Sequence, residues 1–151
     1  FVNKIYHMGK KRIIKKAGGE VDKGLQSRSL ARLSKKKLDF GILHVQATYN
    51  NTKLLLTDRK GGAVMWSSAG ALGFKGAKKG TPFAAAKVGE LLGEKASMIG
   101  VKNADVVIKG VGGGRESALR GFTAKGIQIA SIKDMTPIPH NGPRQKKARR
   151  V

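Results

Sequence analysis

The chain has 151 residues, enough for one folded domain with extensions, and its 31 Lys and Arg against 9 Asp and Glu give a net charge of +22. This charge favours a polyanionic partner. Nucleic acid ranks ahead of an anionic membrane or an acidic protein, because each phosphate contact releases counterions. The absence of cysteine excludes disulfides, thiolate metal sites and cysteine catalysis. No apolar run approaches the roughly 20 residues of a membrane span.

Residues 1–39 are predicted to form a basic arm. Lysine and arginine clusters at 10–16 and 34–38 flank a glycine-containing middle, in which S-R-S-L-A-R-L at 27–33 is typical of a short helical turn. Such a turn is marginal in isolation, so we expect the arm to become ordered only on a partner. The sequence starts with Phe rather than Met, which a cleaved organellar presequence would explain.

The apolar pattern next predicts an antiparallel meander of three strands. Asn50-Asn51 supplies the turn chemistry of the first hairpin, and Lys60-Gly61-Gly62 supplies that of the second. Trp66 lies in the middle of the third strand and is expected to face the core rather than to form a stacking platform for a base. The three strands are expected at residues 40–49, 52–58 and 63–68.

A loop and a helix follow the meander. Residues 69–80 contain four Gly and three Lys, which is typical of a loop. Thr81 is suited to cap the helix, Pro82 to occupy its first position and Gly100 to end it. The apolar stripe of this helix consists of Ala84, Val88, Leu91, Leu92, Ala96 and Ile99.

The remainder of the domain alternates strand and helix. Residues 103–109 read as a buried strand, G-V-G-G-G-R-E-S at 110–117 opens a helix that reaches about Lys125 before Gly126, and residues 127–134 form a last strand. Leu119 and Phe122 are expected to face the core.

The resulting order is βββαβαβ. It predicts an α/β domain over residues 40–135: a mixed five-stranded sheet with flanking helices, in which strand–helix–strand crossovers from the third strand onward give parallel neighbours. A tail at 136–151 follows, where a proline-rich turn leads into five positive charges that no acid interrupts.

Three loops have the chemistry of anion binding. The glycine loop before Arg115 can bring backbone N–H groups and a helix N-terminus to a phosphate, or its glycines can simply serve a tight turn. In the 70–80 loop, Phe74 can stack on an unpaired base or anchor the loop in the core, and the second is favoured. The Asn50–Lys53 turn can bind phosphate or sugar, or can be only a hairpin turn.

Catalysis is not expected. The acids of the domain form no recognisable motif, and the three histidines (His7, His44 and His140) show no metal-ligand spacing. We therefore expect no enzyme activity, no cofactor, no metal and no small-molecule substrate. The acids considered were Asp58, Glu90, Glu94, Asp105, Glu116 and Asp134.

Five segments together resemble the universal S-eleven family of small-subunit ribosomal proteins, and the similarity covers about residues 40–151. They agree in order and spacing with the family pattern, except that Val111 and Gly113 replace the usual prolines of the glycine loop and Pro143 replaces the usual Cys. The segments are H-V-Q-A-T-Y-N-N-T (44–52), T-D-R-K-G (57–61), G-F-K-G-A-K-K-G-T-P-F-A-A (73–85), K-G-V-G-G-G-R-E-S (109–117) and D-M-T-P-I-P-H-N-G (134–142).

The resemblance implies a ribonuclease-H-like fold without a nuclease site. It also implies a structural role on the platform of the small subunit, near the messenger RNA exit side, beside proteins of the S-seven, S-eighteen and S-twenty-one families. The candidate RNA contacts are Asn50, Asn51, Thr52, Lys53, Phe74, Lys75, Lys78, Lys79, Gly112, Gly113, Gly114, Arg115, Arg120, His140, Asn141, Arg144, Lys146, Lys147, Arg149 and Arg150.

The long basic arm favours a mitochondrial ribosome over a plastid or bacterial one. Two alternatives to a ribosomal role are a nucleic-acid-processing enzyme of the same fold class and a free basic protein that binds chromatin or membranes.

Overall fold

The computed structural model describes Gly24, Ser27, residues 37–144, Lys146 and Lys147. Most of the predicted arm and the end of the tail, with Arg149 and Arg150, therefore lie outside the described residues. Within these residues, no helix combines the length and the apolar character that crossing a membrane requires.

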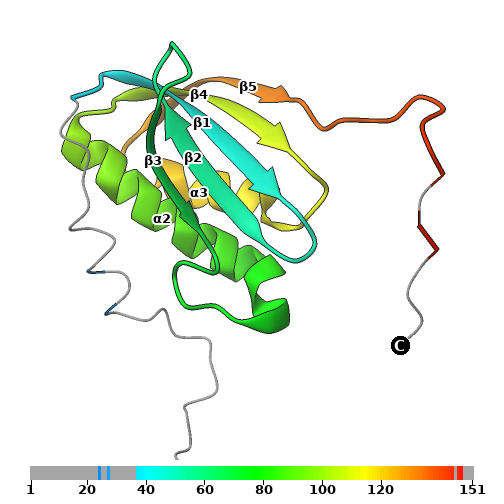
Figure 1. The fold of residues 1–151 in the computed structure, drawn as a ribbon. Coiled ribbons are helices and arrows are strands. Elements are labelled where there is room, and N and C mark those ends of the chain that lie inside the picture. Colours follow the sequence, from blue (N-terminus) through cyan, green and yellow to red (C-terminus); the bar gives the residue numbers. More distant parts are fainter. Residues whose placement is uncertain (1–23, 25–26, 28–36, 145, 148–151) are drawn as a thin grey trace, which may run out of the picture.

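A mixed five-stranded sheet forms the centre of the domain (Figure 1), as the sequence predicts. The spatial order is β3-β2-β1-β4-β5. The first three strands form the predicted antiparallel meander, whereas β4 is parallel to β1 and β5 is parallel to β4. The strands are β1 (Phe40–Ala47), β2 (Thr52–Thr57), β3 (Ala63–Ser68), β4 (Asn103–Lys109) and β5 (Gln128–Asp134).

The prediction of parallel neighbours is correct for β4 and β5 but wrong for β3 and β4. The crossover from β3 passes over both β2 and β1, and β4 pairs with the far side of β1. This arrangement makes β4 an inner strand, and its Ala104 and Val106 are completely buried. A strand with such an apolar run is more stable with neighbours on both sides than at an edge.

Helix α2 (Pro82–Ile99) begins and ends where the sequence predicts. The Thr81 hydroxyl accepts a hydrogen bond from the Ala84 amide at 3.3 Å, and Gly100 ends the helix with a φ of 100°. Every residue of the predicted apolar stripe is buried. A short 3-10 helix, η1 (Gly76–Gly80), precedes α2 within the predicted loop.

Helix α3 (Gly114–Thr123) is slightly shorter than predicted. It ends at Thr123 because the chain turns there, and the Gly126 amide donates to the Thr123 carbonyl at 3.0 Å. Phe122 is completely buried, and Leu119 packs partly buried against the core, as expected.

Both helices cover the same face of the sheet (Figure 1). They pack closely on each other because Gly89 and Gly121 lie at their contact: a Cβ atom on Gly89 would stand 2.2 Å from the Ala118 carbonyl oxygen. Inward-facing side chains of β1 and β2, such as Leu43 and Leu56, complete the core beneath them.

Neither α2 nor α3 covers the opposite face of the sheet, and this corrects the prediction for Trp66. Its side chain is 66% exposed. The flanking residues Met65 and Ser67 are buried on the helix side, and alternation along β3 therefore turns Trp66 outward.

Candidate nucleic-acid interface

The predicted loops converge at one end of the sheet because of the strand directions. The parallel strands β1, β4 and β5 all end there, and both α2 and α3 begin there. The turn after β1, the loop after β3, the glycine loop after β4 and the tail after β5 therefore leave the sheet together (Figure 1). We call this region the loop end of the domain. The carboxyl ends of parallel strands are a common place for ligand binding in α/β sheets.

The turn between β1 and β2 is held by its own hydrogen bonds. The Thr48 hydroxyl donates to the Asn51 carbonyl at 2.9 Å and accepts from the Asn51 amide at 3.1 Å. Asn50 is exposed and Asn51 is half-buried, whereas Thr52 is completely buried. The Thr52 hydroxyl thus lies under the turn, where a Cβ atom on Gly114 would be 2.3 Å away, while Asn50 remains accessible.

The loop after β3 packs against this turn. A Cβ atom on Gly80 would lie 2.1 Å from the Tyr49 carbonyl oxygen. Phe74 is 7% exposed, and its ring meets that of Phe83 edge-on at 6.1 Å. Of the two alternatives for Phe74, the structure shows the core anchor, which leaves the neighbouring lysines Lys75 and Lys78 exposed.

The glycine loop also contacts the strand ends. The Gly112 amide donates to the Ala47 carbonyl at 3.0 Å, and a Cβ atom on Gly112 would lie 2.3 Å from the Thr48 carbonyl oxygen. Gly110 has a φ of 101°. Gly110 and Gly112 are therefore required by the turn itself. Gly113, in contrast, is exposed, and no side chain caps the first turn of α3.

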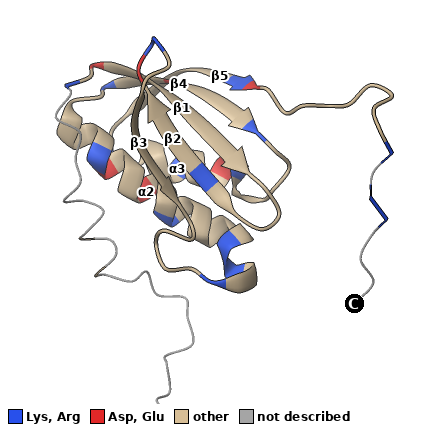
Figure 2. Ribbon diagram, viewed as in Figure 1, with Lys and Arg blue, Asp and Glu red and all other residues tan. Residues whose placement is uncertain are grey.

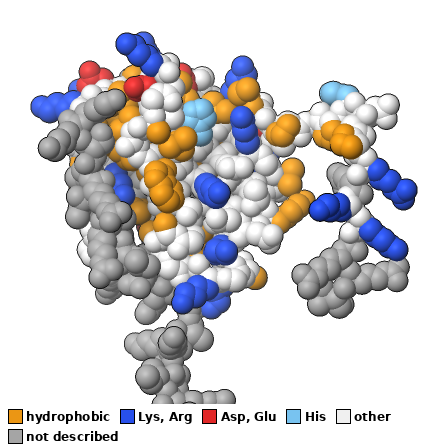
Figure 3. Space-filling view, in the orientation of Figure 1, with side chains coloured by type: hydrophobic (Ala, Val, Ile, Leu, Met, Phe, Trp, Pro, Cys, Tyr) orange, Lys and Arg blue, Asp and Glu red, His pale blue; other side chains and the backbone are white. Residues whose placement is uncertain are grey.

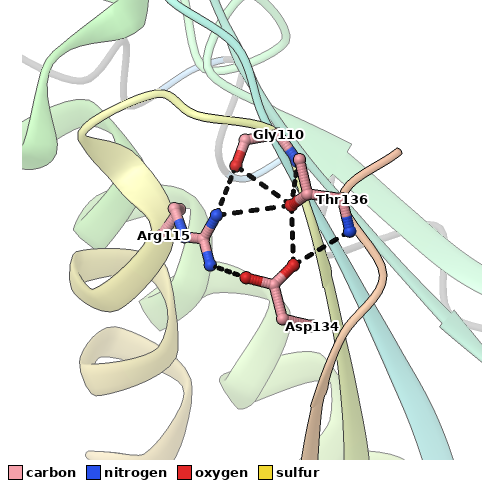
Figure 4. Close-up of polar contacts among 4 residues, drawn as sticks. All are labelled: Gly110, Arg115, Asp134 and Thr136. Atoms are coloured by element: carbon pink, nitrogen blue, oxygen red, sulfur yellow. Dashed lines mark hydrogen bonds and ion pairs between the residues drawn. The ribbon is translucent and has the colours of Figure 1, made fainter. Parts of the chain in front are cut away.

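Arg115 lies within a polar network rather than pointing into solvent (Figure 4). Its guanidinium donates to the Gly110 carbonyl at 2.5 Å and to the Thr136 hydroxyl at 3.4 Å, and it forms an ion pair with Asp134. The Gly110 amide donates to the same Thr136 hydroxyl at 3.1 Å. We call these residues the Arg115 network. It fastens the start of the tail to the glycine loop.

Hydrogen bonding lowers the pKa of Asp134 to about 2. The largest cause is the bond from the Thr136 hydroxyl, and the second is the bond from Arg115. The network is thus built around a carboxylate that stays ionised through the neutral and mildly acidic range.

Lys and Arg residues outnumber Asp and Glu at the loop end and in the described part of the tail (Figure 2). Lys53, Lys75 and Lys109 are exposed, and none of them forms an ion pair within the part of the chain that the structure describes. In the tail, His140, Asn141, Arg144, Lys146 and Lys147 are all exposed. Arg120 differs, because it lies on the outer side of α3 and pairs with Glu116 at 3.4 Å.

Among the described residues, no group of His, Asp and Glu could hold a metal ion. The acids have individual roles instead. Asp58 accepts from the Gly62 amide at 2.6 Å, Asp105 accepts from the Ser131 hydroxyl at 2.6 Å, and Glu94 pairs with Lys125 at 2.7 Å.

A comparison with protein families distinguishes a ribosomal protein from the two alternatives, a nucleic-acid-processing enzyme and a free basic protein. A family model described as ribosomal protein S11 matches residues 41–150. The chain belongs to the ribosomal protein S11 family.

Ribosomal protein S11 is a structural, non-enzymatic family of the small ribosomal subunit, and its members bind the RNA of that subunit. The chain is accordingly a ribosomal protein with a role in translation. The resemblance carried by the sequence motifs is confirmed for the family, over nearly the whole span that it was expected to cover.

The structure adds surface residues of this S11-family chain that the sequence did not single out. Tyr49 was expected to end the first strand, but it lies on the turn after β1 and is 77% exposed. Phe83 is half-exposed beside Lys87, whose ammonium lies 5.9 Å from the centre of the ring. The proximity of Tyr49 to Asn50-Asn51 was the one available signal for an exposed aromatic side chain here.

Proposed function

We propose that the loop end and the tail form one continuous surface for small-subunit ribosomal RNA. The observation that carries this proposal is the convergence of the turn after β1, the loop after β3, the glycine loop and the tail at one end of the sheet. Separate basic loops would each bind weakly, but contacts made together on one RNA add their counterion release.

Different residues of the predicted set serve this surface in different ways. We propose direct RNA contacts for the exposed members, which include Asn50, Lys75, Gly113, Arg144, Lys146 and Lys147. Phe74, Thr52 and Arg115 are proposed to support those contacts from beneath, because they are buried or engaged in internal hydrogen bonds.

The motifs also support a finer placement. We propose that residues 40–135 form the RNA-binding domain, between a basic arm at 1–39 and the tail at 136–151. We place it on the platform near the messenger RNA exit side, beside the S-seven, S-eighteen and S-twenty-one families. The D-M-T-P-I-P-H-N-G segment at 134–142 supports this placement most directly. A mitochondrial ribosome is the proposed location, supported by the basic sequence ahead of the domain.

Neutralising the tail tests the proposal. Replacing Arg144, Lys146 and Lys147 by Ala should weaken binding to a small-subunit RNA fragment and lower the slope of log K against log salt by about 1 for each lost phosphate contact. Filter binding or fluorescence anisotropy over a salt series measures both quantities.

The matched control replaces one arginine and two lysines by Ala, namely Arg59, Lys60 and Lys102, which are exposed at the opposite end of the sheet. Affinity and salt slope should change much less in this control. Equal losses in both variants would show that only overall charge matters and would contradict a defined RNA surface.

A further inference from the structure

The face of the sheet opposite the helices carries a row of side chains that crosses all five strands. Strand register places Trp66 beside Leu55, Leu55 beside His44, His44 beside Val107 and Val107 beside Lys133. We call this surface the open face. Figure 3 shows it from the front, with apolar and basic side chains interspersed over the strands.

Trp66 is the most accessible apolar side chain of this row. It is 66% exposed, whereas Leu55, His44 and Val107 are half-buried by their neighbours. A large ring that stands out of a strand surface gains little from the fold itself. Its flat faces are instead available to another flat group.

The charges near the loop end of the open face are mainly positive. Register and alternation place Lys53, Lys109 and Lys133 on the open face, and all three are exposed. Asp105 lies on the same face but accepts a hydrogen bond from Ser131. The pKa of His44 is lowered by burial and by the charge of Lys109, so this ring adds no positive charge at neutral pH. Acidic side chains gather instead near the end of the face that is opposite the loop end (Figure 3).

The open face is continuous with the loop end. Lys53 follows the turn after β1 directly, and Lys109 precedes Gly110 of the glycine loop. Five strands at a spacing of roughly 4.8 Å give a width of about 19 Å, enough for several nucleotides. A nucleic acid that contacts the loops can thus extend onto the open face, where its phosphates still lie near lysine side chains.

We propose that the open face binds an unpaired segment of RNA, with one base stacked on Trp66 and the phosphates beside Lys53, Lys109 and Lys133. This inference rests on the proposed RNA-binding function and extends it to a second surface. An unpaired strand fits better than a duplex, because only unstacked bases can lie on an aromatic ring. An acidic protein segment fits less well, because the apolar neighbours of Trp66 are half-buried and offer little contiguous apolar area.

Trp66 provides its own probe, because it is the single tryptophan of the chain. We expect its fluorescence to be quenched when the full chain is titrated with an unstructured oligoribonucleotide of about 10 nucleotides. A duplex of the same length should bind through the loops and the tail with much less quenching. Quenching by an acidic peptide but not by the single strand would overturn the proposal in favour of a protein site.

Substitution of Trp66 gives the second arm of the test. Trp66→Thr introduces a β-branched side chain that suits a strand. It should weaken single-strand binding by roughly 5- to 150-fold, the range that stacking of one base contributes. Trp66→Phe should retain most of the affinity, and duplex binding should change little in either variant. Thermal unfolding confirms that both variants fold, which is expected for an exposed position.

The two proposals fail in different ways. If Trp66→Thr binds the single strand as tightly as the original chain, the open face is not an RNA site, although the loops and the tail can still be one. If the original chain has no affinity for small-subunit RNA, the proposed function fails as a whole, together with this inference.

Discussion

At the scale of single residues, Arg115 shows how position changes the role of a side chain. An arginine at the start of a helix after a glycine loop is typical of phosphate binding. Here its guanidinium is occupied by Gly110, Asp134 and Thr136. The residue therefore fixes the start of the tail, and we propose that it influences RNA binding only through the orientation of the tail.

Replacing Asp134 by Asn should destabilise the Arg115 network at neutral pH. The folded carboxyl has a pKa of about 2 against an ordinary value of 3.8. A carboxyl group whose pKa is lower in the folded state stabilises the fold fully at pH values above its unfolded pKa. This stabilisation is lost as the pH falls from the unfolded pKa through the folded pKa. The melting temperature of the original chain should therefore exceed that of Asp134→Asn at pH 7, and the difference should shrink between about pH 4 and pH 2.

Thermal unfolding followed by circular dichroism over this pH range measures the effect. Glu116→Gln is the control, because the pair of Glu116 with Arg120 is highly exposed and should contribute little. A difference between Asp134→Asn and the original chain that stays constant down to pH 2 would contradict an ionised Asp134 in the network.

At the scale of elements, the glycine loop combines a geometric requirement with an accessible surface. Gly112 lies against the Thr48 carbonyl, whereas the adjacent Gly113 is exposed and a Cβ atom there would meet only Pro82 at 3.6 Å. Substitution of Gly112 therefore tests the geometry of the turn, whereas substitution of Gly113 changes only the exposed surface of the loop.

Gly112→Ala should destabilise the fold by about 1–3 kcal/mol, because the added methyl group cannot fit without moving the backbone of the neighbouring turn. Gly113→Ala should leave stability within about 0.5 kcal/mol of the original chain. Urea unfolding of the two variants provides the measurement, and equal stabilities would show that the loop does not pack on the turn after β1.

The bounds of helices and strands can be predicted from adjacent residues, but the spatial neighbours of each element cannot. Thr81, Pro82 and Gly100 place the ends of α2 correctly because capping depends only on adjacent backbone. The pairing of β4 with β1 depends on contacts that are distant in sequence. The outward position of Trp66 depends on which face of the sheet the helices cover, and no residue within β3 encodes that choice.

The same contrast between local features and contacts distant in sequence applies to the candidate site. The exposed positions of Arg144, Lys146 and Lys147 in the tail, and of Lys75 and Lys78 in the loop after β3, could be predicted from composition, because lysine and arginine in a loop are rarely buried. The burial of Thr52 and the network of Arg115 could not, because each depends on a contact between segments that the sequence separates widely.

At the scale of the whole molecule, the strand directions place the binding loops and the start of the tail together. β1, β4 and β5 all end at the loop end, and the Arg115 network holds the start of the tail there. The RNA contacts that we propose for the tail can therefore be made on the same RNA as those that we propose for the loops. Two linked binding segments on one ligand act with a raised effective concentration.

If the loops and the tail bind the same RNA at the same time, their contributions should add. Replacing Lys75 and Lys79 by Ala should lower the salt slope by about 2, replacing Arg144, Lys146 and Lys147 by about 3, and both together by about 5. The free-energy losses in RNA binding should add within about 0.5 kcal/mol, because the two sets share no ion-pair partner among residues 37–144, Lys146 and Lys147. Anisotropy titrations of the three variants over a salt series decide the question. The prediction is wrong if the combined variant binds RNA as tightly as the more impaired of the two separate variants. That result would mean that the loops and the tail bind alternately, each to its own stretch of RNA.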